Sequence, residues 1–450
     1  MTPPKRQLGL GIAAAIVVAN MIGAGVFTSA GFQAASLSDP TTMLLTWVVG
    51  GVLALCGAAT YAELGALMPR AGGEYVYLRE AYHPAVGFMS GWVSLTAGFS
   101  APIAAAALLF SGYLGKVVPG IDSDVAVKVV ACVLVVAVTL LHAFDTKVGG
   151  RVQAAFTIAK VLLIVGFVVA GFAVGSGDWS HLDTRGPGLG QLGTLGGASA
   201  FATSLMYVSF AYSGWNAAAY IAGEIKEPQR TLPRALVLGT GAVMVLYILL
   251  NVVFLYAVPP EGMMDKDGPI KEVGDLAARH LFGNGAGSLL STMIALALVS
   301  SVSAMIMAGP RVYAAMAADH ALPAPLAQFN ERGVPVHAIV TQCVLAIAFV
   351  LVGEVGELIE FVGFTLTLFA ALTVGSVFVF RARDQRAAYR TFGYPVTPIL
   401  FILLSVWIVY LRTKSSPLQS ALVAGLLAAG AVVYLATSRG KSHLKIEEDE

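Results

Sequence analysis

The stretch Met21-Ile22-Gly23-Ala24-Gly25-Val26-Phe27 interrupts an apolar run that extends from Leu8 to Phe32. Each glycine weakens a helix by about 1 kcal/mol relative to alanine, so the glycine pair favours a break in the helix. Lipid supplies no water to the backbone groups that a break frees, and irregular backbone at membrane depth survives only where it lines a cavity or is held by protein. The stretch therefore indicates a broken membrane helix beside a cavity. The alternative is that its glycines only allow close helix packing.

A second interruption lies at Phe210-Ala211-Tyr212-Ser213-Gly214, within the apolar stretch 198–222. Two broken segments in corresponding halves of a multi-pass chain are the best sequence indication of a transporter's binding site. Either break alone is explained equally well by helix packing, whereas the pairing of the two favours a site. We therefore expect one cavity bounded by both breaks.

Hydrophobic residues make up 57% of the chain and charged residues only 12%, with a mean hydropathy of +0.79. Soluble domains contain about 25% charged residues, so the composition identifies an integral membrane protein. The net charge of +1 and the lack of a basic run give no support to nucleic-acid binding. Three cysteines fall in apolar segments without a pairing pattern, so we expect neither a disulfide nor a metal site.

The hydrophobic pattern predicts an all-α membrane protein with twelve spanning segments of about 20 residues each. The predicted spans are 8–37, 41–68, 85–115, 125–142, 151–175, 197–222, 233–258, 286–316, 335–353, 358–381, 396–412 and 417–437. Because the breaks fall in the first and sixth spans, we expect two inverted five-helix repeats and two added helices. The expected units are a single transporter domain at 1–440, with repeats at 8–175 and 197–381 and added helices at 396–437, and a disordered charged tail at 441–450.

Lysine and arginine placement predicts the orientation in the membrane. With the N-terminus inside, 18 of the 27 basic residues fall in inner segments and 8 in outer segments, and the remaining one is Lys160. This asymmetry predicts a multi-pass protein of the cell membrane, the inner membrane in a bacterium, with both termini cytoplasmic. The loop at 259–285 would then form an external cap. The apolar run after Lys5 and Arg6 lacks a convincing cleavage site, so we interpret it as a retained first helix.

The backbone at the breaks offers partners to both charged groups of an amino acid. The half-helix that begins near Val26 points unpaired N–H groups and the positive end of its dipole at residues 23–25, which suits a carboxylate. The half-helices that end near Met21 and Ile22, and near Phe210, expose carbonyl groups, which suit an ammonium group. One cavity with both kinds of partner predicts an α-amino acid as ligand and leaves its side chain open.

Lys160 is the only ionisable residue that the pattern places well inside a span. A charged lysine at a helix centre costs several kcal/mol, so such residues are functional candidates by default. Burial also favours release of the proton, which would allow coupling. Ser300, Ser301 and Ser303 offer acceptors for its ammonium protons. The alternatives are that Lys160 extends to the inner surface and that the serines serve helix packing.

Four residues at the second break are candidates for a gate and a side-chain pocket: Phe210, Tyr212, Gly214 and Asn216. An aromatic side chain there would close over a ligand, and a buried asparagine needs a polar partner. The alternatives are ordinary core packing for the aromatic residues and a helix–helix hydrogen bond for Asn216.

Four charged residues at predicted inner ends of spans are expected to form a cytoplasmic charge cluster or inner gate: Glu63, Arg79, Glu224 and Arg311. No acidic residue falls at the centre of a span, which disfavours a dicationic substrate. The sequence contains no zinc-protease motif, paired intramembrane aspartates, nucleophile elbow or phosphate loop, so we do not expect an enzyme. No cofactor, metal, nucleic acid or accessory subunit is indicated.

Several motifs in this order resemble the amino acid–polyamine–organocation (APC) superfamily. They are Ile22-Gly23-Ala24-Gly25-Val26-Phe27, Tyr61-Ala62-Glu63-Leu64-Gly65, Pro69-Arg70-Ala71-Gly72-Gly73-Glu74-Tyr75, Phe210-Ala211-Tyr212-Ser213-Gly214-Trp215-Asn216, Gly309-Pro310-Arg311-Val312-Tyr313 and Phe392-Gly393-Tyr394-Pro395. The resemblance covers nearly the whole chain. The fourth motif is most similar to the L-type amino acid transporter (LAT) branch.

The resemblance implies a LeuT-like fold of 5+5 inverted repeats plus two helices, working by alternating access. Backbone around Ala24 and Gly25 would hold the substrate carboxylate. Carbonyl groups of Met21, Phe210 and Ser213 would hold its amine, and Phe210 would gate the external side. Lys160 matches a lysine that takes the place of a structural sodium ion in sodium-independent relatives.

These observations predict a sodium-independent secondary transporter of L-amino acids, with a neutral substrate favoured. It would work as an antiporter by exchange, or by proton coupling. One alternative is a cationic amino acid or polyamine antiporter. An alternative of another class is a non-transporting membrane sensor or assembly protein, which would need neither the breaks nor the buried lysine.

Overall fold

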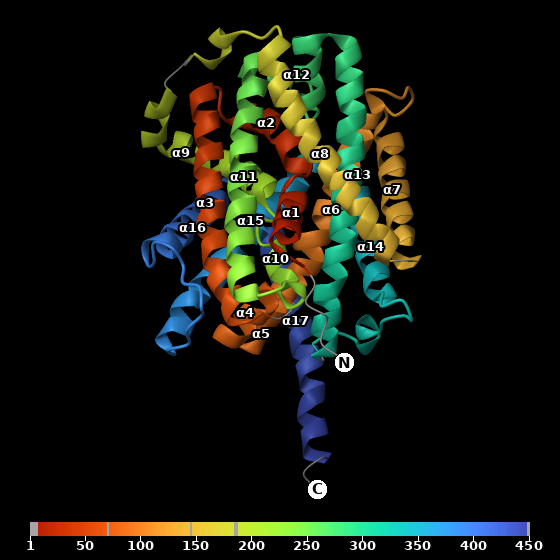
Figure 1. Cartoon of the computed structure of the whole chain (residues 1–450), viewed down its shortest axis with the longest axis vertical. Coiled ribbons are helices and arrows are strands. Elements are labelled where there is room, and N and C mark those ends of the chain that lie inside the picture. Colours follow the sequence, from red (N-terminus) through yellow and green to blue (C-terminus); the bar gives the residue numbers. More distant parts are fainter. Residues whose placement is uncertain (1–7, 70–71, 145, 184–187, 320, 448–450) are drawn as a thin grey trace.

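The computed structural model describes residues 8–69, 72–144, 146–183, 188–319 and 321–447. Arg70 and Ala71 of the third motif, together with Lys5 and Arg6, lie outside these residues. Across the described chain the fold is helical apart from one antiparallel pair of two-residue strands (Figure 1). Strand β1 (Met264–Asp265) pairs with β2 (Gly268–Pro269), with Met264 opposite Pro269.

The α-helices are α1 (Leu10–Met21), α2 (Ala24–Ser36), α3 (Pro40–Leu67), α4 (Glu74–Ala81), α5 (Pro84–Val93), α6 (Ala101–Gly115), α7 (Asp124–Phe144), α8 (Thr146–Val174), α9 (Leu195–Tyr212), α10 (Ala217–Tyr220), α11 (Pro228–Ala257), α12 (Val273–Phe282), α13 (Asn284–Ala318), α14 (Val336–Val352), α15 (Val355–Ala382), α16 (Val396–Ser415) and α17 (Pro417–Glu447). A π-helical turn, η1 (Ser94–Ser100), joins α5 to α6. Five short 3-10 helices are η2 (Trp179–Leu182), η3 (Gly188–Gly193), η4 (Ala222–Glu224), η5 (Pro260–Met263) and η6 (Ala324–Ala327).

Ten helical stretches among the described residues are long and apolar enough to cross a membrane. The chain is therefore a multi-pass membrane protein. The two remaining predicted spans are shorter helices in the structure. One is α14, which has 17 residues, and the other is interrupted between α9 and α10. The count of twelve spans stays a prediction, as does the division into inverted repeats.

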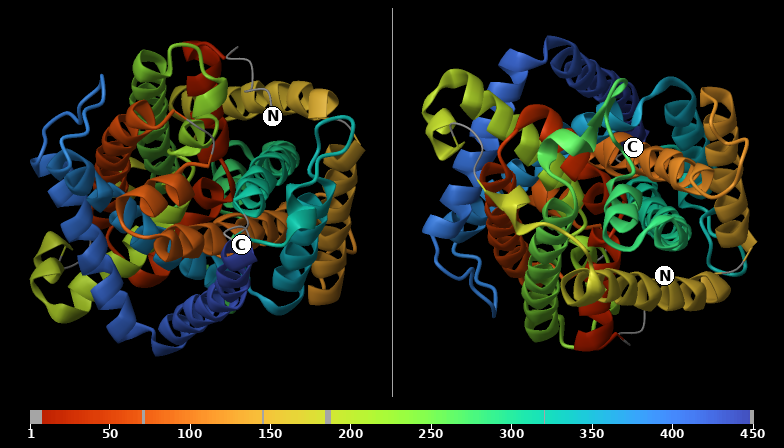
Figure 2. Two further views of the ribbon diagram at one scale, coloured as in Figure 1. Left: turned by 90° about the horizontal axis from the view of Figure 1, so that it is seen from below. Right: turned by 90° about the horizontal axis from the view of Figure 1, so that it is seen from above.

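The spanning helices differ strongly in how far they are buried within the bundle. The buried share of the most apolar window is 89% for Pro84–Gly115 but only 11% for Pro417–Thr437. Figure 2 shows the bundle from both ends, with α7, α14, α16 and α17 at its rim. The outer faces of the rim helices are apolar, as with Val125, Val129 and Val133 on α7, and so match lipid.

Two expectations outside the breaks need correction. The tail expected to be disordered is helical at least to Glu447, because α17 continues well past residue 437. The loop at 259–285, whose role as an external cap stays a prediction, contains η5, the strand pair and α12. The expected charge cluster is replaced by separate contacts of Glu63, Arg79 and Arg311, while a role as an inner gate stays a prediction. Helices α4 and α10 lie at the lower end of the bundle in Figure 1.

Two ion pairs at that lower end join helices that are distant in sequence. Arg381 of α15 donates from Nε and Nη2 to the two carboxylate oxygens of Glu63 in α3, at 2.8 and 2.7 Å. Arg79 of α4 pairs with Asp319 after α13. Arg311, by contrast, donates to the Met307 carbonyl of its own helix. The pairs form across helix boundaries, which spacing along the sequence does not reveal.

Arg381→Ala is expected to lower the free energy of unfolding by about 3 kcal/mol, because it leaves the buried Glu63 carboxylate without its cation. Arg386→Ala is the matched control, since its pair with Asp384 is mostly exposed and is worth at most about 1 kcal/mol. Equilibrium unfolding of the purified protein measures both. Equal losses of unfolding free energy in the two variants would show that the Arg381–Glu63 pair does not stabilise the fold.

Candidate functional site

The first break separates α1 from α2 by two residues in extended conformation. Helix α1 ends at Met21 and α2 begins at Ala24. Ile22 has φ −71° and ψ 96°, and Gly23 has φ −142° and ψ −155°. Among the described residues, no side chain caps the start of α2. The first N–H groups of α2 are thus left for another acceptor.

The second break follows α9 and needs glycine. Helix α9 ends at Tyr212, and Ser213 is extended with ψ 151°. Gly214 then has φ +93°, a left-handed conformation that other residues rarely adopt. The chain passes through Trp215 and Asn216 before the short helix α10. The break predicted at residues 210–214 is therefore confirmed. The helix ends at Tyr212, two residues after Phe210.

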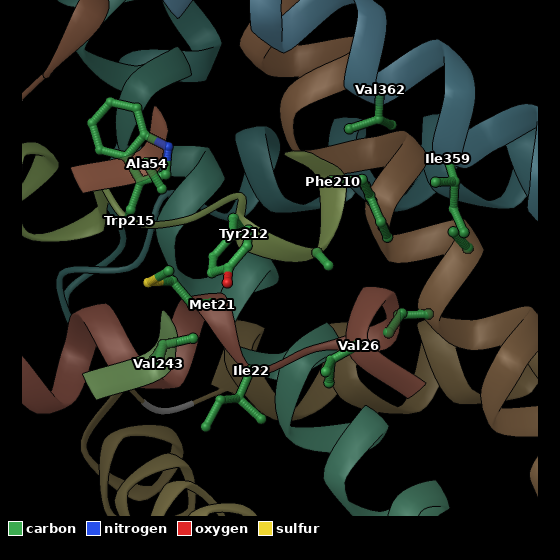
Figure 3. Packing of buried hydrophobic residues seen from close by; sticks show 14 of the residues in the cluster. Met21, Ile22, Val26, Ala54, Phe210, Tyr212, Trp215, Val243, Ile359 and Val362 are labelled. Carbon is green, nitrogen blue, oxygen red and sulfur yellow. The ribbon is translucent and has the colours of Figure 1, made fainter. Parts of the chain in front are cut away.

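The two breaks pack directly against each other. A methyl group at Gly25 would lie 2.4 Å from Cα of Ala211, and one at Gly214 would lie 2.8 Å from the carbonyl of Asn20. Figure 3 shows Met21, Ile22 and Val26 along the first break, with Phe210 and Tyr212 drawn above them. Glycine is required at both crossings because backbone meets backbone there. Close packing and a cavity thus occur together at this site.

A cavity of about 40 Å³ lies at the crossing and is here called the first cavity. Its lining comes from both breaks and from α6 and α13: Ala19, Asn20, Met21, Gly23, Ala24, Gly25, Pro102, Ala106, Phe210, Ala211, Ser213, Ser301, Ala304 and Met305. The uncapped start of α2 borders it, so N–H donors and the positive end of the helix dipole are available to an anion. Ile22 and Val26 are fully buried beside this lining.

Side chains from three other helices bond the carbonyl groups that the breaks free. Tyr247 of α11 places its hydroxyl 2.6 Å from the Met21 oxygen and 3.2 Å from the Ala211 oxygen. The Ser301 hydroxyl of α13 donates to Ile22 at 3.3 Å. A carbonyl oxygen has two lone pairs, so the Met21 and Ala211 groups can still accept from a ligand's ammonium.

Lys160 of α8 is fully buried and reaches the first break. Its Nζ donates to the carbonyl oxygen of Ala19 at 2.5 Å and to that of Ile22 at 2.7 Å. The lysine therefore does not extend to the surface, which was the alternative. Its ammonium sits at the C-terminal end of α1, where the helix dipole favours positive charge.

The serines expected near Lys160 are buried on α13, but two of them form hydrogen bonds with other groups. Ser303 lies 2.8 Å from Nε2 of His142 on α7, and Ser301 bonds Ile22 and the Ala297 carbonyl. Ser300 is fully buried. A coupling role for the three serines stays a prediction.

The gate candidates divide between two cavities. Phe210 lines the first cavity, whereas Tyr212, Gly214 and Asn216 line a second cavity of about 60 Å³ on the other side of the second break. Ser213 lines both. The Tyr212 hydroxyl donates to the Trp47 carbonyl at 3.1 Å, and Asn216 donates to Glu74 at 3.0 Å. These bonds give Asn216 its polar partner.

Sequence reasoning missed Tyr247 and Glu74. Tyr247 lies in an apolar run, where one tyrosine gives no local signal of its contacts. Glu74 begins the short helix α4, which hydropathy does not mark as buried. An acidic residue directly after Gly72-Gly73 was the signal available for Glu74, but only the fold shows that its carboxyl group is inside the protein.

Two broken helices that cross around a cavity in a multi-pass bundle are typical of a membrane permease. Residues 8–431 match the amino acid permease family, and the chain therefore belongs to that family, which consists of transporters and not enzymes. It is accordingly an amino acid transporter.

Curated relatives match over almost the full chain. The serine/threonine exchanger SteT of Bacillus subtilis is 30% identical, covering 97% of this chain and 98% of that protein. The b(0,+)-type amino acid transporter 1 of Mus musculus is 27% identical over 92% of this chain and 84% of its own. The large neutral amino acids transporter small subunit 2 of Homo sapiens is 25% identical over 96% and 80%.

Gly25→Ala is expected to destabilise the protein by about 1–3 kcal/mol, because the new methyl group overlaps the backbone of Ala211. The matched control is Gly166→Ala on α8, where an added methyl group meets nothing within 4 Å and the change should be neutral or slightly stabilising. Thermal unfolding in detergent compares the two. A Gly25→Ala variant as stable as the control would contradict the close crossing of the breaks.

Proposed function

We propose that the chain is a sodium-independent exchanger of small neutral L-amino acids. The single observation that supports sodium independence best is the position of the Lys160 ammonium between the carbonyl oxygens of Ala19 and Ile22. Carbonyl oxygens at the end of a broken helix are the usual ligands of a coupling sodium ion in transporters of this type. A resident lysine supplies the positive charge at that position, so no sodium ion is needed to hold the break.

The substrate is proposed to bridge the two breaks in the first cavity. Its carboxylate accepts from the N–H groups at the start of α2, around Ala24 and Gly25. Its ammonium donates to carbonyl groups of Met21, Phe210 and Ser213. Its side chain then faces α6 and α13, where Ala106 and Met305 line the cavity.

Two observations favour a small neutral side chain. The described lining of the first cavity contains no charged side chain, which disfavours the cationic amino acid or polyamine alternative. At about 40 Å³ the cavity has room for about three water molecules, so a large side chain would require much greater widening. The similarity to a serine/threonine exchanger supports the same substrate class.

The finer architecture belongs to this proposal. We propose twelve spans arranged as repeats 8–175 and 197–381 with two added helices at 396–437. The excess of lysine and arginine in the predicted inner segments supports a cytoplasmic lower end in the cell membrane, with both termini inside. Substrate access would alternate between the two sides, and the ion pairs Arg381–Glu63 and Arg79–Asp319 would hold the cytoplasmic side closed.

Proteoliposomes that contain only this chain test the substrate and the mode of transport. We expect labelled serine and alanine to enter only when unlabelled amino acid is inside, and arginine to enter poorly. Replacing sodium with choline should leave the rate unchanged. A steep dependence on sodium would contradict the role given to Lys160, and uptake of arginine above serine would favour the cationic alternative.

Lys160→Met keeps most of the side-chain length and removes the charge. It is expected to reduce exchange at least about tenfold, because two charged hydrogen bonds of about 1.5–3 kcal/mol each are lost at the break. Lys128→Met on α7 is the control, since that ammonium pairs with Asp124 at the helix start. Size-exclusion profiles establish folding. Exchange by Lys160→Met at the control's rate would show that the lysine is dispensable.

A further inference from the structure

Glu74 is a buried carboxyl group outside the first cavity and at the start of α4. Its exposed fraction is 6%. The hydroxyl of Tyr61 in α3 donates to its Oε1 at 2.6 Å, and Nδ2 of Asn216 donates to the same oxygen at 3.0 Å. One carboxylate oxygen thus connects α3 with Asn216, which follows the second break.

The groups that face Glu74 from the packed elements are phenols and an amide. Tyr61 faces it from α3, Tyr77 from α4 itself, and Tyr220 and Asn216 from the region of α10. The neighbouring arginines are paired with other carboxylates, Arg79 with Asp319 and Arg381 with Glu63. Arg70 lies outside the described residues. Burial raises the pKa of the Glu74 carboxyl, although its two hydrogen bonds act in the opposite direction.

Helix α4 is fastened to the part of the bundle that does not contain the breaks. Tyr75 donates to Asp319 at 2.8 Å, beside the Arg79 pair, which holds α4 to the end of α13. Arg383, directly after α15, donates to the carbonyl groups of Glu80 and Ala81 at 2.7 and 2.9 Å. Glu74 is therefore the point where this anchored helix holds α3 and the second break.

The second cavity gives the Glu74 carboxyl a polar surrounding. Glu74, Asn216, Ser213, Ser209 and Ser405 all contribute to its lining. Among the described residues, the buried hydroxyls of Ser209 and Ser405 have no hydrogen-bond partner. A cavity of about 60 Å³ with such groups has room for about four water molecules, and these can deliver a proton to the carboxyl.

We propose that Glu74 is a proton-binding site that controls opening of the lower, cytoplasmic side. As a carboxylate it accepts two strong hydrogen bonds and holds α3 and Asn216 to α4. A proton delivered by water adds to Oε2 and gives the neutral acid, whose oxygens accept more weakly. The second break is then released, and the cytoplasmic side opens more readily. Exchange should therefore become faster as the pH falls. Because burial raises the pKa of the Glu74 carboxyl, the protonated, faster-exchanging protein should persist to a higher pH than an ordinary glutamate would allow.

The transport test compares the wild type, Glu74→Gln and Glu80→Gln in proteoliposomes at equal inner and outer pH, from mildly acidic to mildly alkaline. This test rests on the proposed exchange function. Glutamine imitates the neutral acid, so Glu74→Gln should lose the pH dependence and keep the fast rate of the acidic limb. Glu80→Gln, on the exposed side of the same helix, should keep the wild-type profile. An unchanged profile in Glu74→Gln, or a wild type without any such acceleration, would overturn the proposal.

A second test does not depend on transport. A single cysteine replaces Ala218 on α10, which is fully buried, in a chain whose three native cysteines are changed to alanine. At one fixed neutral pH, its labelling by a maleimide should be faster with Glu74→Gln than with Glu74. Equal labelling rates would show that Glu74 does not control the opening of the cytoplasmic side. This result would hold even if the protein showed no exchange and the proposed function had failed.

Discussion

The structure depends on the need to satisfy backbone groups inside a membrane. At each break the helix leaves N–H and C=O groups without partners, and lipid cannot solvate them. Lys160, Tyr247 and Ser301 bond the carbonyl groups at the first break, and Tyr247 also reaches Ala211 beside the second. Helices α8, α11 and α13 must therefore surround the breaks, which fixes the centre of the bundle.

The same need explains why the site is so narrow. The two breaks support each other by direct backbone contact at Gly25 and Gly214, and Gly239 lets α11 approach α1 at Val17. Such contacts leave little room, and the remaining space is bordered by the uncapped start of α2. A small cavity bordered by backbone N–H groups is thus the geometric result of two broken helices in mutual contact.

The sequence predicted those features that break a local rule of membrane chains. A glycine pair at residues 23 and 25 located the first break, and the stretch ending at Gly214 located the second. A lone lysine in a span located the buried cation. What it could not supply was the partner of each group, because partners come from helices far away in the chain. Tyr212 and Asn216 show this limit clearly. They neighbour the break in sequence, yet the left-handed turn at Gly214 and the bonds to Trp47 and Glu74 direct them to the second cavity.

The tyrosine that bridges the breaks has one further consequence. A phenol carries a single proton, yet the Tyr247 oxygen lies within hydrogen-bond distance of both Met21 and Ala211. It can donate fully to only one of the two at a time, so the two carbonyl groups compete for one donor. An ammonium group brings three donors, and its arrival at Met21 would leave the phenol free to serve Ala211. In the proposed binding mode the ligand's ammonium would supply the second donor, and this would favour a closed form that contains its ligand.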